Sequence, residues 1–405
     1  MESERIHGYF VGVSNFESPP APLRQGLRSE WLLRDDITFL NHGSFGALPR
    51  RIYEEQADWR KRIEAEPIEL IARRRVELLG VAKRKIADFV HAEPDDFGFV
   101  TNATEGINAV LRSMRLRAGD ELLTTSHVYN AVRKAMQYVA SGADATYREV
   151  DVPLPVASSD QIAERVLSGL SNRTRLLVID HVTSPTALIF PIRKIIAECN
   201  ARKIDVLVDG AHAPGMLPLD IPSLGASYYT GNLHKWAASP KGTGFLWVRK
   251  DRQADIHPLI VSHHYGEGFV AEFGWQGTRD LATWLAAPAG LSFMAELGWD
   301  NVMTHNHAMA TWVQRLLCKR WNVQPISPVD GSLLGSMASI KLPGKLADLT
   351  DSQALHLNQR LYNEFKIEVP IMAWNGHVLA RPCCQVYNTP SEYEWLADVI
   401  CELAR

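Results

Sequence analysis

The stretches TRLLVID (174–180) and DVLVDGAH (205–212) decide the fold. Each is a short apolar run that reaches an aspartate, and PIRKIIAECNARK (191–203) lies between them with apolar residues at helical spacing. A strand, a helix and a second strand of this length form one βαβ unit, whose strands are parallel. Asp209 is therefore expected at the carboxyl edge of a sheet, where open α/β proteins bind their ligands.

The same alternation extends in both directions along the chain. Further strand candidates are FGFVT (97–101), DELLTT (120–125) and TGFLWV (243–248), and further helix candidates are EGINAVLRSM (105–114), NAVRKAMQYVA (130–140) and SDQIAERVLSGL (159–170). Strands and helices that alternate in this way predict an α/β fold with a mainly parallel sheet covered on both faces.

The segments outside this alternation predict a three-part organisation. Residues 1–50 are expected to form an irregular arm, a short strand near residues 37–40 and the glycine-punctuated loop NHGSFGALP (41–49). Two long helices separated at Pro67 open a large domain over residues 51–285. Helices dominate residues 281–321 and a mixed αβ pattern follows, which predicts a smaller C-terminal α+β domain over residues 286–405.

Composition argues against several classes of partner. The chain of 405 residues is 46% hydrophobic and 22% charged, with a formal net charge of −3. No basic field is present to attract nucleic acid or an anionic membrane, and no run approaches the roughly 18 apolar residues that a membrane span needs. The five cysteines are odd in number and two of them are adjacent, which disfavours a disulfide scaffold. A cytoplasmic protein is expected.

The lysine loop GNLHKWAASPKGTGFLWV (231–248) carries the first candidate for chemistry. Trp236, Phe245 and Trp247 surround Lys235 in sequence, and aromatic side chains of this size are seldom exposed. Burial makes a lysine amine easy to deprotonate, as Schiff-base chemistry requires. The alternative is a surface lysine in a polar turn.

Two further motifs fit the same chemistry. A strand-end carboxylate at Asp209 needs a cationic partner in a dry crevice, and a protonated pyridine nitrogen would serve; the alternative is a helix cap. TNATEGIN (101–108) predicts a helix start with free N–H groups, which is an anion site; the alternative is a plain capped helix.

The order of these motifs resembles the class V aminotransferase superfamily of fold type I pyridoxal phosphate (PLP) enzymes. TSPTALIFPI (183–192), DGAHAPG (209–215), GNLHKW (231–236), GTRD (277–280) and YNTP (387–390) are most similar to its isopenicillin N epimerase-like branch. The resemblance covers residues 37–395 and implies a seven-stranded-type, mainly parallel sheet in the large domain.

The resemblance also implies roles for residues at matching positions. Lys235 would hold the aldehyde carbon of pyridoxal 5'-phosphate, Asp209 would pair with its ring nitrogen, and His212 would contact its phenolic oxygen. The other cofactor contacts would come from Ala103 and Thr104 at the phosphate, Asn232 and His234 on the lysine loop, and Gly277 and Thr278 from a second subunit. The active unit would then be a homodimer with shared sites.

On the substrate side, the resemblance implies that Arg381 binds the carboxylate of an amino acid. The loop with Asn41, His42 and Gly43 would line the substrate pocket. Either His127 or Tyr129, both in SHVYNAV (126–132), would stack on the cofactor ring, and spacing does not separate them.

Labilisation at the α-carbon leaves several reactions open. An epimerase of the isopenicillin N type is the first hypothesis, and a C–S lyase for cysteine-type substrates is the main alternative. Transamination is less favoured. Residues 325–380 contain no cysteine, so a persulfide-forming desulfurase is disfavoured. The paired histidines 263–264 and the histidines at 305 and 307 lack ligands at metal spacing, so no metal is expected. A cofactor-free scaffold protein is the remaining alternative.

Overall fold

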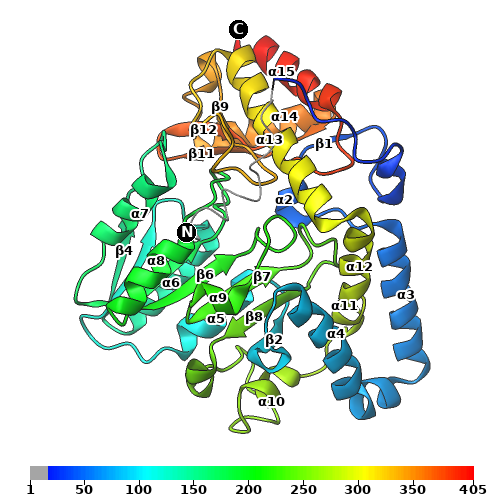
Figure 1. The fold of residues 1–405 in the computed structure, drawn as a ribbon, viewed down its shortest axis with the longest axis vertical. Coiled ribbons are helices and arrows are strands. Elements are labelled where there is room, and N and C mark those ends of the chain that lie inside the picture. The colour runs from blue at the N-terminus through cyan, green and yellow to red at the C-terminus, as the bar shows by residue number, and fades with distance from the viewer. Residues whose placement is uncertain (1–16) are drawn as a thin grey trace.

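A seven-stranded sheet is the central element of the computed structural model, which describes residues 17–405 (Figure 1). Its strands run in the order β2-β8-β7-β6-β5-β3-β4. Their bounds are β2 (Phe97–Val100), β3 (Glu121–Thr125), β4 (Thr146–Val150), β5 (Thr174–Asp180), β6 (Asp205–Gly210), β7 (Tyr228–Asn232) and β8 (Gly244–Val248). Only β8 is antiparallel to its neighbours; the other pairs are parallel. The predicted α/β fold with a mainly parallel sheet is confirmed.

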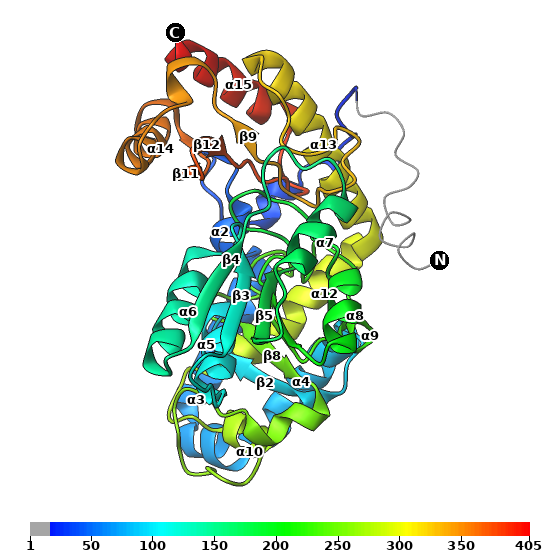
Figure 2. The ribbon, with the colours of Figure 1, turned by 90° about the vertical axis from the view of Figure 1, so that its left-hand side faces the viewer.

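Helices cover both faces of this sheet, as Figure 2 shows. The helices α5 (Ala103–Ser113) and α6 (Asn130–Gly142) pack on one face, and α4 (Arg75–Phe89), α7 (Ser159–Ser168), α8 (Ile192–Ala201) and α12 (Ala287–Leu297) lie on the other. Alternate residues of one strand point to opposite faces. Leu176 and Val178 of β5 accordingly join one core, while Leu177 and Ile179 join the other.

Two strands of the sheet were not predicted. The edge strand β4 has no fully buried residue, because only one of its faces packs against the protein, and its residues TYREV lack an apolar run. The strand β7 is fully buried, but it includes Gly231. A side chain at Gly231 would meet the Phe245 ring at 2.7 Å, so the packing of β8 requires a residue that weakens the strand pattern.

The smaller part of the molecule has its own sheet and core. Its three strands, β9 (Ile340–Lys341), β11 (Ile371–Trp374) and β12 (His377–Ala380), are antiparallel in the order β11-β12-β9. They pack with α13 (Trp299–Trp321), α14 (Asp351–Phe365) and α15 (Pro390–Ala404) around a second hydrophobic cluster. The predicted domain limits at residues 50 and 285 stay predictions, although Leu291 packs in the large core and Met309 in this second one.

The N-terminal segment joins the two parts. Its strand β1 (Thr38–Phe39) pairs in parallel with β10 (Ile367–Glu368), which places the start of the described chain against the C-terminal part. A one-turn helix, α2 (His42–Phe45), follows where a loop was predicted, and it ends at Gly46 with φ +69°. Residues 1–16 of the predicted arm lie outside the described part of the chain.

The remaining elements are short, apart from the helices before the first strand of the large sheet. The helix α3 (Arg50–Ala65) is followed by the π-helix η2 (Ile68–Arg73), which confirms the predicted break near Pro67. The others are η1 (Leu27–Glu30), η3 (Pro94–Asp96), α9 (Ile221–Leu224), η4 (Lys250–Asp255), α10 (Phe269–Gly274), α11 (Ala282–Leu285) and η5 (Gly344–Leu346).

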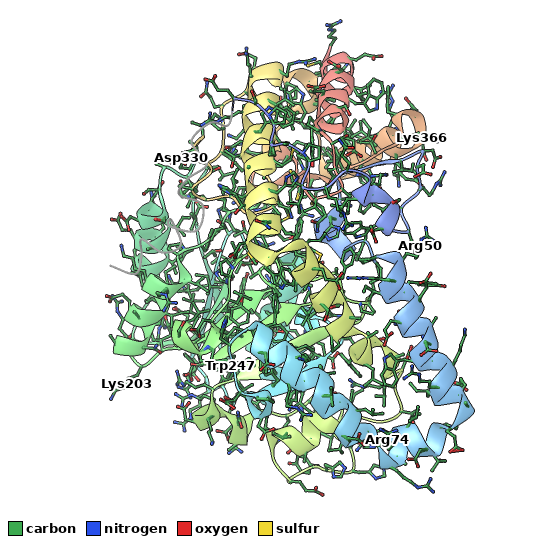
Figure 3. All side chains as sticks on the ribbon, turned by 45° about the vertical axis from the view of Figure 1, so that its right-hand side comes forward. Arg50, Arg74, Lys203, Trp247, Asp330 and Lys366 are labelled. Carbon is green, nitrogen blue, oxygen red and sulfur yellow. The ribbon has the colours of Figure 1, made fainter. Side chains whose placement is uncertain are left out.

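The arginines between α3 and α4 are engaged within the chain. Arg74 lies at the edge of the molecule (Figure 3), where it forms an ion pair with Glu77. Arg73 pairs with Glu69, and the Arg75 guanidinium stacks 4.2 Å from the Trp275 ring centre. Within residues 17–405, no helix combines the length and apolar character needed to cross a bilayer.

Candidate active site

A cavity of about 380 Å³ opens at the carboxyl ends of β5, β6 and β7. Its wall combines the ends of these strands with the start of α5, the lysine loop, α2 and the segment after β12. The lining residues are Gly43, Ser44, Phe45, Thr101, Asn102, Ala103, Thr104, Tyr129, Asp180, Val182, Ser184, Asp209, Ala211, His212, Asn232, His234, Lys235, Lys241, Gly242 and Arg381. The topology therefore brings together motifs that lie up to 338 positions apart, from Gly43 to Arg381.

The lysine loop is fixed to the rest of the site at three points. Asn232 Oδ1 accepts a hydrogen bond of 2.8 Å from the Ala103 N–H at the start of α5. His234 Nδ1 lies 3.1 Å from the Thr243 carbonyl oxygen across the loop. His42 Nε2 lies 2.9 Å from the carbonyl oxygen of Lys235 itself. The backbone that carries the amine is thus held from two sides.

The amine of Lys235 loses its proton more readily than an ordinary lysine amine. Burial first, and then the positive charge of Arg381, lowers its pKa to about 8, although Asp209 acts in the opposite direction. Lys235 Nζ lies 3.2 Å from His212 Nε2. Burial, and to a smaller extent the positive charge of Lys235, also hold the pKa of His212 well below its usual value. The predicted burial of this lysine is confirmed in part: Lys235 is partly buried on the cavity wall, and Trp236, Phe245 and Trp247 around it are each at most 3% exposed.

Two carboxyl groups, those of Asp180 and Asp209, also line the cavity. Asp180 and Asp209 end β5 and β6 and are paired in register. Burial raises the pKa of both, and the Asp209 charge adds to the effect on Asp180. Asp209 Oδ1 accepts a hydrogen bond from the Ala211 N–H at 2.9 Å, whereas Asp180 Oδ2 is buried without a partner. Asp180 was predicted only as a strand end.

The start of α5 offers fewer free donors than the sequence implied. Asn102 caps the helix by accepting from the Glu105 N–H at 3.0 Å. The Ala103 N–H, which the resemblance assigned to phosphate, donates to Asn232 instead. Thr104 lies on the cavity wall. Anion binding here is therefore expected from Thr104 and the side-chain amide of Asn232, because neutral His234 already uses its Nδ1–H on the Thr243 carbonyl, and a contact from His234 to an anion requires protonation of its Nε2.

Arg381 is a buried cation with an incomplete set of partners. Its Nη1 donates to the Ser184 carbonyl oxygen and, at 3.1 Å, to the Ser184 hydroxyl. Its Nε is buried without a partner. No Asp or Glu of residues 17–405 lies within ion-pair distance of it, although a buried charge normally needs one.

The structure separates the two candidates for ring stacking. Tyr129 is half exposed and lines the cavity. His127 is fully buried behind the wall, 2.6 Å from Thr186 Oγ1 and 2.7 Å from the Val152 carbonyl oxygen. Its ring also contacts Trp374. His127 is therefore not placed to touch a ligand.

Comparison with known proteins agrees with this geometry. The family model for class-V aminotransferases matches residues 66–391. The chain belongs to the class-V aminotransferase family. Pyridoxal phosphate is the cofactor of this family, so the predicted PLP-dependent enzyme is confirmed.

Curated relatives of this class-V enzyme carry more than one activity. An isopenicillin N epimerase of Amycolatopsis lactamdurans is 33% identical, with 93% of this chain and 98% of the relative covered. A probable chloroplastic L-cysteine desulfhydrase of Arabidopsis thaliana is also 33% identical, with 94% and 86% covered. The resemblance to the isopenicillin N epimerase-like branch is thus confirmed.

Solved structures give the same fold. The cystine C–S lyase C-DES, in complex with cysteine persulfide, aligns with a TM-score of 0.76 at 22% identity, covering 91% of this chain and 98% of that one. An apo cysteine desulfurase from Thermococcus onnurineus NA1 aligns with a TM-score of 0.77 at 15% identity, covering 96% and 99%. The predicted fold type I architecture is confirmed.

In the class-V enzyme, the N-terminal loop is largely structural. Gly43, with its neighbours Ser44 and Phe45, lines the cavity, but Asn41 and His42 do not. Asn41 donates to Glu368 Oε1 at 2.8 Å, and buried His42 lies 2.8 Å from the Tyr387 hydroxyl. Asn41 and His42 are thus held by contacts outside the cavity lining, and their place on the substrate side stays a prediction.

Gly277 and Thr278 of the class-V enzyme lie away from this cavity. Neither lines it, and Thr278 is exposed. The adjacent Arg279 contacts Glu105 of α5 at 3.7 Å, and Asp280 accepts from Arg60 at 2.8 Å. Arg279 and Asp280 thus hold this segment against the rest of the chain, while Thr278 is exposed. Its contribution to a second subunit stays a prediction.

The paired histidines and cysteines outside the cavity lining are packed in the protein or paired with neighbouring residues. Within residues 17–405, no three His, Cys, Asp or Glu side chains are grouped to bind a metal ion. His264 pairs with Glu267, and His305 and His307 are buried on α13. Cys383 and Cys384 are fully buried, as predicted, and burial raises the pKa of both thiols.

Proposed function

We propose that this enzyme removes the α-proton of a small free amino acid and then expels a sulfur group from its β-carbon. The observation that carries the proposal is Arg381, a buried guanidinium on the cavity wall without a carboxylate partner. A substrate α-carboxylate would supply the missing charge, and the planar fork of arginine matches its two oxygens. Ser184 accepts from Nη1, and Nη2 makes only a 3.5 Å contact with Ser44 Oγ, so Nη2 is the nitrogen of the fork with the weaker contact.

The residues present fit pyridoxal phosphate. The low-pKa amine of Lys235 suits attachment of an aldehyde, and buried Asp209 has no cation of its own except that amine. A ring nitrogen opposite Asp209 would meet that need, with His212 near the phenolic oxygen and Tyr129 against the ring. Thr104, Asn232 and, once protonated, His234 would bind the phosphate. When bound, the cofactor withdraws electrons from the substrate α-carbon.

Lys235 is the proposed base for the α-proton. A general base works best when its pKa is near the operating pH, and the pKa of this amine is lowered to about 8. It lines the same cavity as Arg381. Arg381 would orient the carboxylate so that the α-C–H bond faces the amine.

The size of the site favours a small substrate. Ligand pockets span roughly 300–1,000 Å³, and this one, at about 380 Å³, must hold both cofactor and substrate. Cysteine-type amino acids fit that limit. The four L-cysteine desulfhydrases among the relatives, at 28–33% identity, are in accord with this choice.

Epimerisation is the second candidate, and one observation favours it. Tyr129 follows β3 and Lys235 follows β7, on either side of the strands that end in the two aspartates. A phenol and an amine on two sides of one cavity could deliver protons to opposite faces of a carbon. Homology to isopenicillin N epimerases agrees with this alternative.

One screen tests the proposal and separates the candidates. The holoenzyme is incubated in D₂O with a panel of amino acids, and α-deuterium, pyruvate, sulfide and optical rotation are followed. Elimination predicts pyruvate, ammonia and sulfide from cysteine, and pyruvate, ammonia and cysteine persulfide from cystine. Inversion of non-sulfur amino acids without pyruvate would replace elimination by epimerisation, and an absence of α-exchange from every amino acid would overturn both.

Two lysine variants control for the cofactor. Borohydride should fix PLP covalently in the parent and in Lys241→Ala, which removes another lysine of the cavity wall. Lys235→Ala should carry no fixed cofactor. Covalent PLP in Lys235→Ala would overturn the assignment of the amine.

A further inference from the structure

The side chains of Trp236, His212 and Lys235 form a chain of hydrogen bonds, in which His212 and Lys235 line the cavity. Trp236 Nε1 donates to His212 Nδ1 at 3.4 Å, and His212 Nε2 lies 3.2 Å from Lys235 Nζ. Trp236 is 1% and His212 2% exposed, so water does not compete for either contact. Lys235 and Trp236, which are adjacent in sequence, thus contact the two ring nitrogens of His212.

The indole decides the direction of this chain. An indole N–H is only a donor, so His212 Nδ1 must accept. A neutral imidazole carries one proton, and burial keeps His212 neutral by holding its pKa well below the usual value. The proton therefore resides on Nε2, which leaves the amine of Lys235 as the acceptor. An ammonium group cannot accept a hydrogen bond, so this arrangement favours the free amine.

The indole is held rigidly enough to impose this choice. Its ring packs against the His42 ring, with centres 5.0 Å apart. A Cβ added at Gly43 would come within 3.3 Å of the indole, and one at Gly215 within 2.5 Å of the Trp236 carbonyl oxygen. Glycine is therefore required at 215, where the chain meets the Trp236 backbone, and the contact at Gly43 shows that the indole is closely packed. The indole has little freedom to turn away from His212.

We propose that Trp236 is a positioning residue that fixes the proton of His212 on Nε2 and so directs a hydrogen-bond donor at Lys235 Nζ. The inference rests on the proposed role of Lys235. It adds that the amine is kept as a free nucleophile before the cofactor arrives. Once the amine is consumed, the same Nε2–H is the donor available to the phenolic oxygen of the ring.

Other charges around the amine act alongside this chain. Arg381 favours the neutral amine, whereas Asp209 and Cys383 favour the ammonium form. His234 is also held neutral by burial and bonds to the Thr243 carbonyl oxygen. All of these groups remain when the indole is removed. A change caused by losing only the Trp236 N–H can therefore be recognised against a constant background.

The tautomer of His212 in the cofactor-free protein tests the proposal directly. With ¹⁵N-labelled histidine, we expect wild-type His212 to carry its proton on Nε2. The variant Trp236→Phe should give a mixture with the Nδ1–H form. A wild-type spectrum with the proton on Nδ1 would overturn the proposal, whether or not the variant folds.

A pH titration of cofactor capture supplies the second readout. The rate at which the cofactor-free protein captures PLP should rise with pH as the amine deprotonates. In Trp236→Phe the midpoint should move up by roughly 0.5–1 pH unit, because His212 can now accept from an ammonium group. Trp247→Phe is the matched control, since it removes a buried indole N–H that has no acceptor.

Equal midpoints in wild type, Trp236→Phe and Trp247→Phe would overturn the proposal. Neither readout uses a substrate or turnover. A failure of the proposed elimination reaction would therefore leave both results standing, and a failure of the tautomer assignment would leave the reaction untouched.

Discussion

Asp180 and Asp209 are in-register partners at the ends of neighbouring parallel strands, so two buried carboxyl groups lie side by side on one wall of the cavity. Two carboxylates in such a place do not both ionise readily. Asp209 has the Ala211 N–H and the Lys235 amine to stabilise its charge, whereas Asp180 Oδ2 has no partner. The pKa of both carboxyl groups is raised by burial, more strongly at Asp180 although the Tyr129 backbone and Arg133 act in the opposite direction, so we expect residue 180 to be the protonated member and residue 209 the charged one.

Replacing the protonated member should make stability less dependent on pH. Burial and Asp209 raise the pKa of Asp180 well above its usual value, so the folded protein retains a proton that the unfolded chain releases above about pH 4. The stability from that proton is lost as pH rises through the folded pKa. Asp180→Asn, which mimics the neutral form, should gain on wild type by up to about 1.4 kcal/mol per pH unit. Urea unfolding of the cofactor-free proteins at several pH values from 4 to 8 measures this, and parallel curves would contradict it.

Removing the charged member should instead damage the chemistry. Asp209→Asn leaves a bound pyridinium without its counter-ion, and breaking a buried pair in this way costs about 3–5 kcal/mol. The rate of α-deuterium exchange should fall by roughly 10²–10⁴-fold. Asp180→Asn is the matched control and should keep most of the activity. Equal losses in the two variants would show that the aspartates do not differ in charge.

The sequence predicted the parts of this fold whose pattern is local. The strand 174–180 and the helices after β2, β3 and β5 were found because each buries a continuous face or run. The strand β4 was missed because an edge strand keeps polar residues. The strand β7 was missed because the Phe245 ring, distant in sequence, leaves room only for a glycine at 231. Local patterns report burial, and they do not report which element does the burying.

The same limit applies to the site. Lys235 and Asp209 could be found from their own neighbours, but Asp180 matters only through its register with Asp209. His127 was a plausible stacking residue by spacing. The His127 side chain instead points into the protein core, where it contacts Thr186, a residue 59 positions later in the chain. Trp236 was read as a sign of burial, because its donor role depends on a histidine 24 positions earlier.

Arg381 should discriminate amino acids from amines. Arg381→Leu removes a charge-assisted contact with the α-carboxylate, worth about 2–3 kcal/mol, so kcat/KM for cysteine should fall roughly 30- to 150-fold. Turnover of cysteamine, which lacks the carboxylate, should be equally poor in both proteins. Ser184→Ala is the matched control, because the Ser184 carbonyl oxygen still accepts from Arg381. If Arg381→Leu kept the preference for cysteine over cysteamine, the carboxylate assignment would be wrong.

Cys383 should not act as a sulfur carrier. Its Sγ accepts from the Gly43 N–H at 3.2 Å and is fully buried, and burial raises the pKa of the thiol. A protonated thiol is a poor nucleophile. Cys383→Ala should therefore release sulfide from cysteine at a rate within about threefold of wild type, since only a buried small group changes. Persulfide on Cys383 during turnover, detected by mass spectrometry, would overturn this prediction.

A mixed-dimer experiment tests whether Gly277 and Thr278 serve a second subunit. Thr278 is exposed in the single chain, so Thr278→Trp should leave the subunit folded and block only a site that it enters. Lys235→Ala inactivates its own cavity. When the two inactive variants are co-expressed, a heterodimer with C2 symmetry has one site with both defects and one with neither. Random pairing should then restore about a quarter of wild-type activity. Failure to recover activity, with heterodimers present by size and mass, would place the effect of residue 278 within its own chain, and an active Thr278→Trp homodimer would place it away from every active site.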